Sequence, residues 1–171
     1  MLPSGSTAPT TPTHGLGQGI APARGGRRAL RGFSEVAVTV TDAQGKTCDV
    51  CLLAATTEAQ RERGLMEVTD PALGGYEGML FEFPDDQSGS FWMRDTPMPL
   101  SIAYFDRNGK VVSITDMAPC ADKPSCPSYP AGGAFRYALE VPKGELGRVL
   151  VAKGSRITIV ARKCPLASGS S

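Results

Sequence analysis

Short runs of alternating apolar residues, separated by frequent turn signals, constrain the fold of this chain most strongly. In the run 35–41, Val36, Val38 and Val40 occupy every second position, which places them on one face of a strand. Asn108 and Gly109 separate two later runs, and this dipeptide readily adopts the positive φ angles of a tight hairpin turn. The pattern predicts a mainly β fold, a compact antiparallel sandwich or barrel of about seven strands.

One helix is expected within this β framework, near residues 57–64. Thr57 and Gln60 have the spacing of a capping box, in which each side chain bonds to the backbone of the other residue. Gly64 follows as a residue that can adopt the left-handed conformation that ends a helix. The sequence therefore predicts a helix of about two turns.

Composition divides the chain into a folded domain and two flanking segments. Residues 1–33 are rich in Gly, Pro, Ser and Thr and contain few aliphatic residues, so they cannot bury enough apolar surface to offset the loss of chain entropy. We predict a disordered tail over 1–33, a folded β domain over 34–164 and a flexible C-terminus over 165–171.

Charge and hydropathy exclude two classes of partner. The net charge is only +1, so the chain has no long basic footprint for nucleic acid. No apolar run approaches the ~20 residues of a membrane helix, so no transmembrane segment is expected. We expect a monomer without a cofactor. The stalk-like start of the sequence suggests the mature part of an exported or lipid-anchored protein whose leader is absent.

The cysteines predict two disulfides and one free thiol. Closing the short loop between Cys120 and Cys126 would rigidify a segment that contains Pro and Ser. Cys164 follows the last predicted strand, and its partner is either Cys48 or Cys51. Disulfides favour an extracytoplasmic location, secreted or in the cell envelope, over the cytoplasmic alternative. A zinc site made by Cys48, Cys51, Cys120 and Cys126 is disfavoured, because the second pair lacks the usual ligand spacing, and no metal is expected.

Five strings, read in order, are similar to the DUF192 (UPF0127) family. They are Arg63-Gly64-Leu65-Met66, Gly78-Met79-Leu80-Phe81, Phe91-Trp92-Met93-Arg94-Asp95-Thr96, Pro99-Leu100 and Leu139-Glu140-Val141. The resemblance implies a compact β-rich single domain and no established activity. The chain has Arg94-Asp95 where the family usually has Lys-Asn, and Ser101 where an acid is common. An acid at the second position is therefore dispensable for any activity that the family shares.

The string 91–96 is the best candidate for a binding site. Alternation places Trp92 and Arg94 on one face, where an aromatic platform and a guanidinium could hold a ring and an anionic group. A structural interpretation is favoured somewhat over this one: Trp92 fills the core and Arg94 pairs with Glu140 or Asp95. The full set of candidate binding residues is Arg63, Trp92, Arg94, Asp95, Thr96 and Glu140.

Arg63 has a structural alternative of its own, since its charge suits the C-terminal end of the predicted helix. Its functional role would be a second cationic wall beside Arg94, which requires both guanidinium groups in one cleft.

Catalysis is a weaker possibility that rests on two acids. Glu140 and Asp95 are the candidate catalytic pair for a carboxylate-dependent hydrolase or glycan-processing enzyme. The side chain of Glu140 faces opposite to Leu139 and is therefore expected to point away from the main core. The only His is His14, in the predicted tail, which excludes a Ser-His-Asp triad in the folded domain.

The sequence thus favours an extracytoplasmic binding or interaction module for a small polar ligand, a glycan or a protein partner. A hydrolase and a purely structural domain on a stalk are the alternatives. A concave pocket that contains Arg94 and Glu140 would favour the enzyme, and a flat aromatic patch would favour partner binding.

Overall fold

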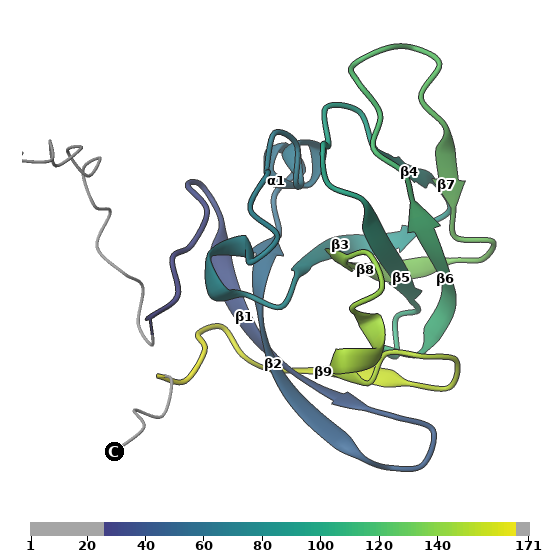
Figure 1. Ribbon diagram of the computed structural model, residues 1–171. Helices are drawn as coiled ribbons and strands as arrows, with labels where there is room; N and C mark the ends of the chain where they lie inside the picture. The colour runs from purple at the N-terminus through teal and green to yellow at the C-terminus, as the bar shows by residue number, and fades with distance from the viewer. Residues whose placement is uncertain (1–25, 167–171) are drawn as a thin grey trace, which may run out of the picture.

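A computed structural model describes residues 26–166 of the chain (Figure 1). Most of the predicted tail 1–33, and residues 167–171 of the predicted flexible C-terminus, lie outside this range. Within it, the fold is mainly β with one short α-helix, as the sequence pattern predicts. No helix among the described residues has the length and apolar character needed to cross a membrane.

The described residues form nine strands, one α-helix and two short 3-10 helices. The strands are β1 (Ser34–Thr41), β2 (Thr47–Ala55), β3 (Met79–Gln87), β4 (Ser90–Trp92), β5 (Leu100–Phe105), β6 (Val111–Met117), β7 (Ser128–Pro130), β8 (Phe135–Pro142) and β9 (Arg156–Ala161). The helices are α1 (Glu58–Arg63), η2 (Leu73–Gly75) and η3 (Leu146–Val149).

Seven of these strands form one sheet in the order β6-β5-β8-β3-β2-β1-β9, and β4 pairs with β7 in a second, small sheet. The pairs are antiparallel except for β2 and β3, which run parallel. The parallel pair is a departure from the antiparallel prediction. Parallel neighbours require a crossover connection, and residues 56–78, which contain α1 and η2, provide it between β2 and β3.

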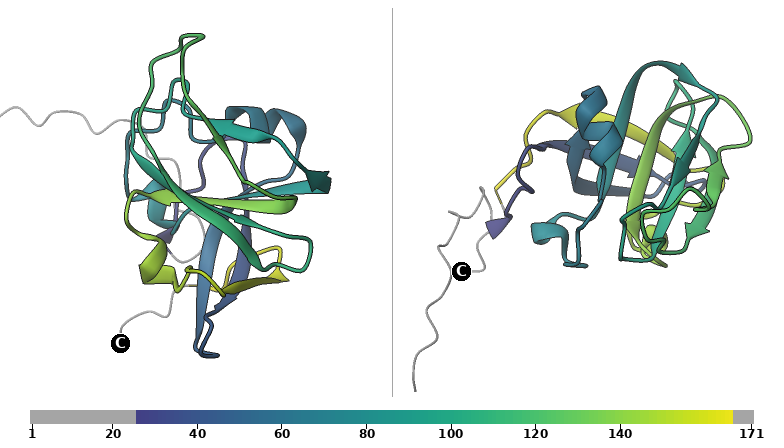
Figure 2. Two further views of the ribbon diagram at one scale, coloured as in Figure 1. Left: turned by 90° about the vertical axis from the view of Figure 1, so that its right-hand side faces the viewer. Right: turned by 90° about the horizontal axis from the view of Figure 1, so that it is seen from above.

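The large sheet is strongly curved, so that its two edge strands approach each other (Figures 1 and 2). The edges meet at an isolated bridge between Lys110 and Arg156. Val111 N donates to Ser155 O at 3.0 Å, and Ile157 N donates to Gly109 O at 2.9 Å. The sheet therefore comes close to a barrel at one point without a continuous closing ladder.

Both faces of this sheet are covered by buried side chains. We call the cluster on one face the Leu139 core, which consists mainly of Val36, Val38, Val40, Leu52, Leu80, Phe105, Leu139 and Val141. We call the cluster on the other face the Phe81 core, whose largest members include Leu53, Leu65, Met79, Phe81, Met93, Ile102, Tyr104 and Phe135. The segments around α1 and β4 contribute Leu65 and Met93 and so help to cover the Phe81 core.

This double covering corrects one prediction. Leu139 and Val141 of β8 belong to the Leu139 core, and Ala138 belongs to the Phe81 core. Glu140 therefore faces opposite to Leu139, as alternation predicts. Its side chain nevertheless does not escape burial, because the residue is only 4% exposed. The sequence pattern identified the face, but the elements that cover that face come from distant parts of the chain.

The disulfides are Cys120–Cys126 and Cys51–Cys164, and Cys48 is a free cysteine. Odd spacing places Cys48 and Cys51 on opposite faces of β2. Cys51 and Cys164 both belong to the Phe81 core, whereas Cys48 packs against the Leu139 core. The face of the sheet on which the C-terminal segment packs therefore selects Cys51.

Residues before the predicted boundary at residue 34 also pack on the domain. Phe33 is buried and Leu30 packs against the Phe81 core. Arg28 N donates to Gly74 O at 2.6 Å, and a Cβ on Gly74 would lie 2.0 Å from Arg28 O. Only glycine fits this approach, so the packed domain begins several residues earlier than predicted.

Candidate functional site

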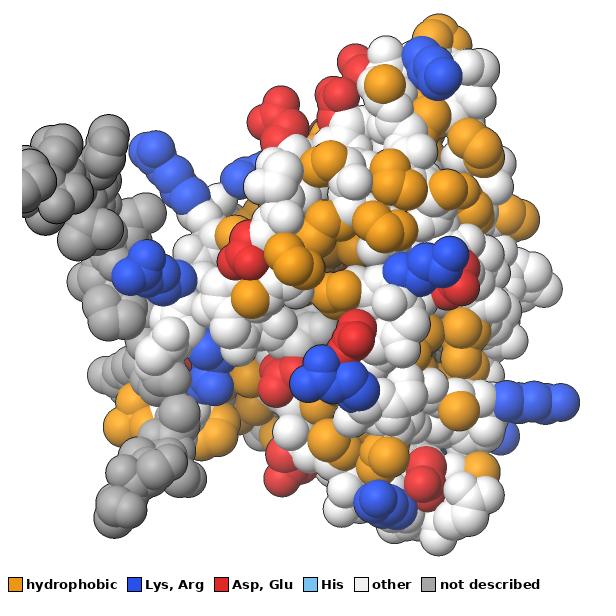
Figure 3. Space-filling model, viewed as in Figure 1, with side chains coloured by type: hydrophobic (Ala, Val, Ile, Leu, Met, Phe, Trp, Pro, Cys, Tyr) orange, Lys and Arg blue, Asp and Glu red, His pale blue; other side chains and the backbone are white. Residues whose placement is uncertain are grey.

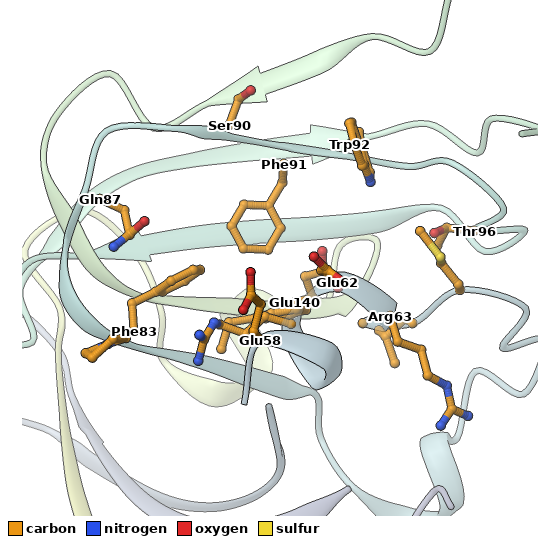
Figure 4. A pocket seen from close by; sticks show the side chains of 16 residues that line it. Glu58, Glu62, Arg63, Phe83, Gln87, Ser90, Phe91, Trp92, Thr96 and Glu140 are labelled. Carbon is orange, nitrogen blue, oxygen red and sulfur yellow. The ribbon is translucent and has the colours of Figure 1, made fainter. Parts of the chain in front are cut away.

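A cavity of about 410 Å³ opens on the side of the sheet that carries the Phe81 core (Figure 4). Its lining comes from α1 and the turn after it, from β3, from β4 and from one residue of β8. Aromatic rings and carboxylates dominate the lining: Phe81, Phe83, Phe91, Trp92, Glu58, Glu62 and Glu140. Hydrophobic side chains also gather on the upper half of the molecular face in Figure 3, with acidic and basic side chains interspersed.

The helix α1 is fixed beside the cavity by its capping box. Thr57 Oγ1 accepts from Gln60 N at 3.2 Å, and the Gln60 side chain accepts from Thr57 N at 3.1 Å, as predicted. Gln60 Nε2 also donates to Gly32 O at 2.8 Å, which ties the helix to the N-terminal segment. Residues four apart share one helix face, so Glu58 and Glu62 both line the cavity.

The aromatic wall is organised around Phe91 of β4. Its ring makes edge contacts with Phe81 at 5.0 Å, with Tyr104 at 5.7 Å and with Phe83 at 6.3 Å between ring centroids. Such edge-to-face pairs are the preferred aromatic geometry and resist rearrangement of the rings. The wall is therefore part of the packed core and is formed before any ligand arrives.

Glu140 provides a carboxyl group at this wall, and the close-up places it at the centre of the view, below Phe91 (Figure 4). It occupies β8, an interior strand of the large sheet, opposite Met79 of β3 and Ile102 of β5. Its side chain makes no hydrogen bond or ion pair with another described residue. Burial raises the pKa of this carboxyl to about 8. Glu140 is consequently mostly protonated at neutral pH.

Of the residues predicted for the site, the structure brings Arg63, Trp92, Thr96 and Glu140 to the cavity, and Arg94 and Asp95 do not line it. Thr96 is buried, and its hydroxyl donates to Arg94 O at 3.1 Å.

Two expectations about the string 91–96 are wrong. Trp92 does not fill the core, since it is 54% exposed at the edge of the cavity. Arg94 pairs with Asp122 at 2.6 Å rather than with Glu140 or Asp95. The isolated bridge of Arg94 with Cys120 brings the disulfide-closed loop, and thus Asp122, to this side chain. Trp92 and Arg94 do share a face, because the guanidinium lies 5.1 Å from the indole ring.

Asp95 and Glu140 do not share the cavity. Asp95 is exposed, has a φ of 51° and accepts a bond from Glu67 N through its backbone oxygen at 2.7 Å. The carboxylates that do line the cavity with Glu140 are Glu58 and Glu62. The geometry thus gives Glu140 different acidic neighbours from those that the sequence suggested.

The arginines of α1 line the cavity and bond to backbone oxygens, and the Arg61 guanidinium also lies 5.1 Å from the ring of Phe83. Arg63 donates to Arg31 O at 2.6 Å, and its guanidinium lies 5.0 Å from the ring of Phe33. Arg61 donates to Thr56 O at 2.6 Å and to Glu82 O at 2.9 Å. Arg63 therefore binds the N-terminal segment and does not form a cationic wall with Arg94.

Five residues that line the cavity were not predicted from the sequence as site residues: Phe81, Phe83, Phe91, Glu58 and Glu62. The i, i+4 spacing of the two glutamates next to a capping box was a usable signal for a shared helix face. The pairing of β4 with β7, which positions Phe91, left no comparable signal because it joins segments far apart in the chain.

The described residues with metal-ligand spacing are Glu35, Cys51 and Cys164. The two cysteines form a disulfide and are not thiolate ligands. Glu35 accepts bonds from Tyr76 Oη at 2.8 Å and Cys164 N at 3.0 Å. This cluster is a structural anchor for the C-terminal segment.

Comparison with known proteins gives a family and a fold. Residues 38–159 match the sequence profile of DUF192, described as "Uncharacterized ACR". A protein of unknown function from Novosphingobium aromaticivorans is 30% identical, with a TM-score of 0.65 over 81% of this chain and 93% of that chain. A protein from Sinorhizobium meliloti described as "a putative transcription regulator" is 26% identical, with a TM-score of 0.61 over 74% of this chain and 95% of that one. No curated protein matches the chain.

Proposed function

Because the chain belongs to the DUF192 family, whose description names no activity, we propose from the cavity itself that this domain is a small-molecule binding module. The proposed ligand has an apolar or aromatic body and at least one polar group. It enters between α1 and β4, with its body against the aromatic wall and its polar group at Glu140.

The carboxyl of Glu140 is the observation that carries this proposal. A buried polar group without a hydrogen-bond partner costs on the order of 1–3 kcal/mol, so stable folds normally satisfy such groups. Glu140 lacks a partner among the described residues, yet it faces a cavity rather than solid packing. A ligand that bonds to this carboxyl would give it the partner that no described residue provides.

The size and lining of the cavity support the same function. Small-molecule sites usually have volumes of roughly 300–1,000 Å³ and combine apolar walls with a few polar groups. This cavity has about 410 Å³, with rings on its walls and carboxylates at its inner and outer parts. Trp92 adds an exposed ring at the edge on which a sugar or another planar group can stack.

We propose that the domain works in an oxidising compartment, secreted or in the cell envelope. The support is the pair of disulfides, which are rare in reducing compartments. Alkylation of protein isolated from its native source without reductant should label Cys48 alone. Labelling of Cys51 or Cys120 as well would contradict this location.

Binding can be tested through Trp92, because the chain contains a single Trp and it lies at the cavity. We expect saturable changes in its emission with at least one of benzyl alcohol, benzylamine, benzoate and glucose. The affinity for the probe should weaken at least tenfold in Glu140→Leu, which replaces the glutamate with an apolar side chain of similar size and so removes the carboxyl.

Glu145→Gln is the matched control, since Glu145 is an acid outside this cavity that pairs with Arg148. It should bind the probes as the natural chain does. No saturable response to any probe, or an unchanged response in Glu140→Leu, would contradict a binding function at this cavity.

A further inference from the structure

We propose that the ligand carries a protonated amine, which binds as an ammonium group between the Glu140 carboxylate and the aromatic wall. This inference rests on the proposed binding function and names its ligand class. Glu58 and Glu62 contribute negative charge at the same cavity.

The acids of α1 at the cavity are available to a cation. Neither Glu58 nor Glu62 forms an ion pair with a described residue. The two arginines that line the cavity are already engaged, since Arg61 and Arg63 donate to backbone oxygens of Thr56, Glu82 and Arg31. Both arginines keep their positive charge and use only Nη1 in these bonds, so the preference for an ammonium group rests on the two unpaired glutamates and the buried Glu140 carboxyl, not on the net charge of the lining.

Glu140 and the aromatic wall also suit an ammonium group. An ammonium has three donors and no acceptor, and the Glu140 carboxylate supplies acceptors without a competing partner among the described residues. The face of an aromatic ring such as that of Phe91 attracts a cation that has lost water. A carboxylate together with rings thus compensates a buried ammonium in a way that rings alone would not.

A neutral ligand is less well matched. Protonated Glu140 could donate to a carbonyl or a hydroxyl, but such a ligand would leave the charges of Glu58 and Glu62 unused. An ammonium interacts favourably with all three acids, of which only Glu140 is buried.

Binding of the cation is coupled to loss of the Glu140 proton. The neutral carboxyl releases one proton to solvent, and the resulting carboxylate pairs with the ammonium. The titratable groups around it are Glu58, Arg61, Glu62 and Arg63 on α1 and its end, and Tyr104 on β5. β3 and β4 contribute to the lining only groups that do not titrate, such as Phe81, Phe83, Gln87 and Phe91. Since the Glu140 pKa is about 8, affinity should rise about tenfold per pH unit below that value.

The test compares benzylamine with benzyl alcohol, which have the same ring and nearly the same shape. Trp92 emission and calorimetry measure both affinities at about pH 6 and about pH 8.5. We expect benzylamine to bind at least tenfold more tightly than benzyl alcohol at the higher pH. We also expect that preference to shrink at the lower pH, with about one proton released per bound amine.

Glu140→Gln keeps the shape of the side chain and should remove the amine preference, its pH dependence and the proton release. Glu145→Gln should retain all three. Equal affinities for the two probes, or a pH-independent amine preference, would overturn the amine inference while leaving a binding cavity in place. Failure of both probes, together with benzoate and glucose, to produce any saturable response would overturn the proposed function as well.

Discussion

The two faces of strand β8 place neighbouring residues in different environments. Leu139 and Val141 pack in the Leu139 core, whose members are mostly aliphatic. Glu140 lies between them on the opposite face, among aromatic residues of the Phe81 core and next to a cavity. One face is built for packing alone, whereas the other combines packing with a cavity and an acid that has no partner among the described residues.

This difference indicates that the position of Glu140 lowers the stability of the domain and serves its proposed function. A buried carboxyl without a partner weakens the fold, and an apolar residue at that position would not. Natural proteins tolerate such costs mainly at sites that bind or react. The contrast between the two faces can therefore be tested by substitutions on each side.

The largest expected effect is the pH dependence of stability caused by Glu140. Below about pH 4.5 the carboxyl is protonated in both the folded and the unfolded state, so ionisation contributes nothing. Between about pH 4.5 and 8 the unfolded chain ionises while the folded chain does not, and stability falls by about 1.4 kcal/mol per pH unit. Above about pH 8 the accumulated loss is on the order of 5 kcal/mol and stays constant.

Glu140→Gln should remove this pH-dependent loss. Urea unfolding of the natural chain and the variant should diverge steadily from about pH 5 to pH 8, with the variant more stable at high pH. A constant difference between the two unfolding curves across this range would show that Glu140 titrates normally in the folded protein.

The second effect lies on the opposite face. Leu139→Ala removes buried methyl groups from the Leu139 core and should cost about 2–5 kcal/mol in the free energy of unfolding. Because no charge changes, this cost should be the same at pH 5 and pH 9. A cost below about 1 kcal/mol would mean that the core around Leu139 can collapse into the space, and a strong pH dependence would blur the distinction between the faces.

A smaller effect is expected at the helix beside the cavity. Thr57→Ala removes the hydroxyl that accepts from Gln60 N, and such caps contribute about 1 kcal/mol. Since α1 carries Glu58 and Glu62, the variant should also weaken benzylamine binding more than benzyl alcohol binding. Thr57→Ser, which keeps the hydroxyl, is the control and should restore both stability and the difference in affinity.

The smallest effect is expected for Arg94→Ala. The ion pair with Asp122 is partly exposed, and pairs of this kind contribute about 0–1 kcal/mol. Probe affinity should change little, because Arg94 does not line the cavity. Destabilisation as large as that of Leu139→Ala would mean that the stack on Trp92 contributes to the packing of the domain. Loss of benzoate binding alone would instead restore the anion-binding role that the sequence suggested.

Features set by neighbouring residues were predictable. The capping box of α1, the turn at Asn108 and Gly109 and the Cys120–Cys126 disulfide each depend on a few adjacent positions. The alternation in β8 also correctly places Glu140 opposite to Leu139. These interactions are short in sequence, so the local pattern contains most of the information that specifies them.

The candidate site was only partly predictable, because its components come from separate segments. Trp92 was expected in the core because aromatic strands are usually buried, but β4 pairs with β7 outside the large sheet and leaves this ring exposed. Arg94 pairs with Asp122 because the loop that follows Cys120 packs beside it. Composition and alternation contain no information about such approaches.

By itself, the sequence determined that the chain forms a mainly β domain with one short helix and that its motifs are those of the DUF192 family. It also determined on which face of each strand a side chain lies. Only the tertiary structure decided that Cys51 rather than Cys48 bonds to Cys164, and that the face carrying Glu140 is covered. The physical reason is that alternation fixes the direction of a side chain, whereas its solvation depends on which distant segments pack over it. The raised pKa of Glu140, and with it the strongest sign of a binding site, arises from that packing.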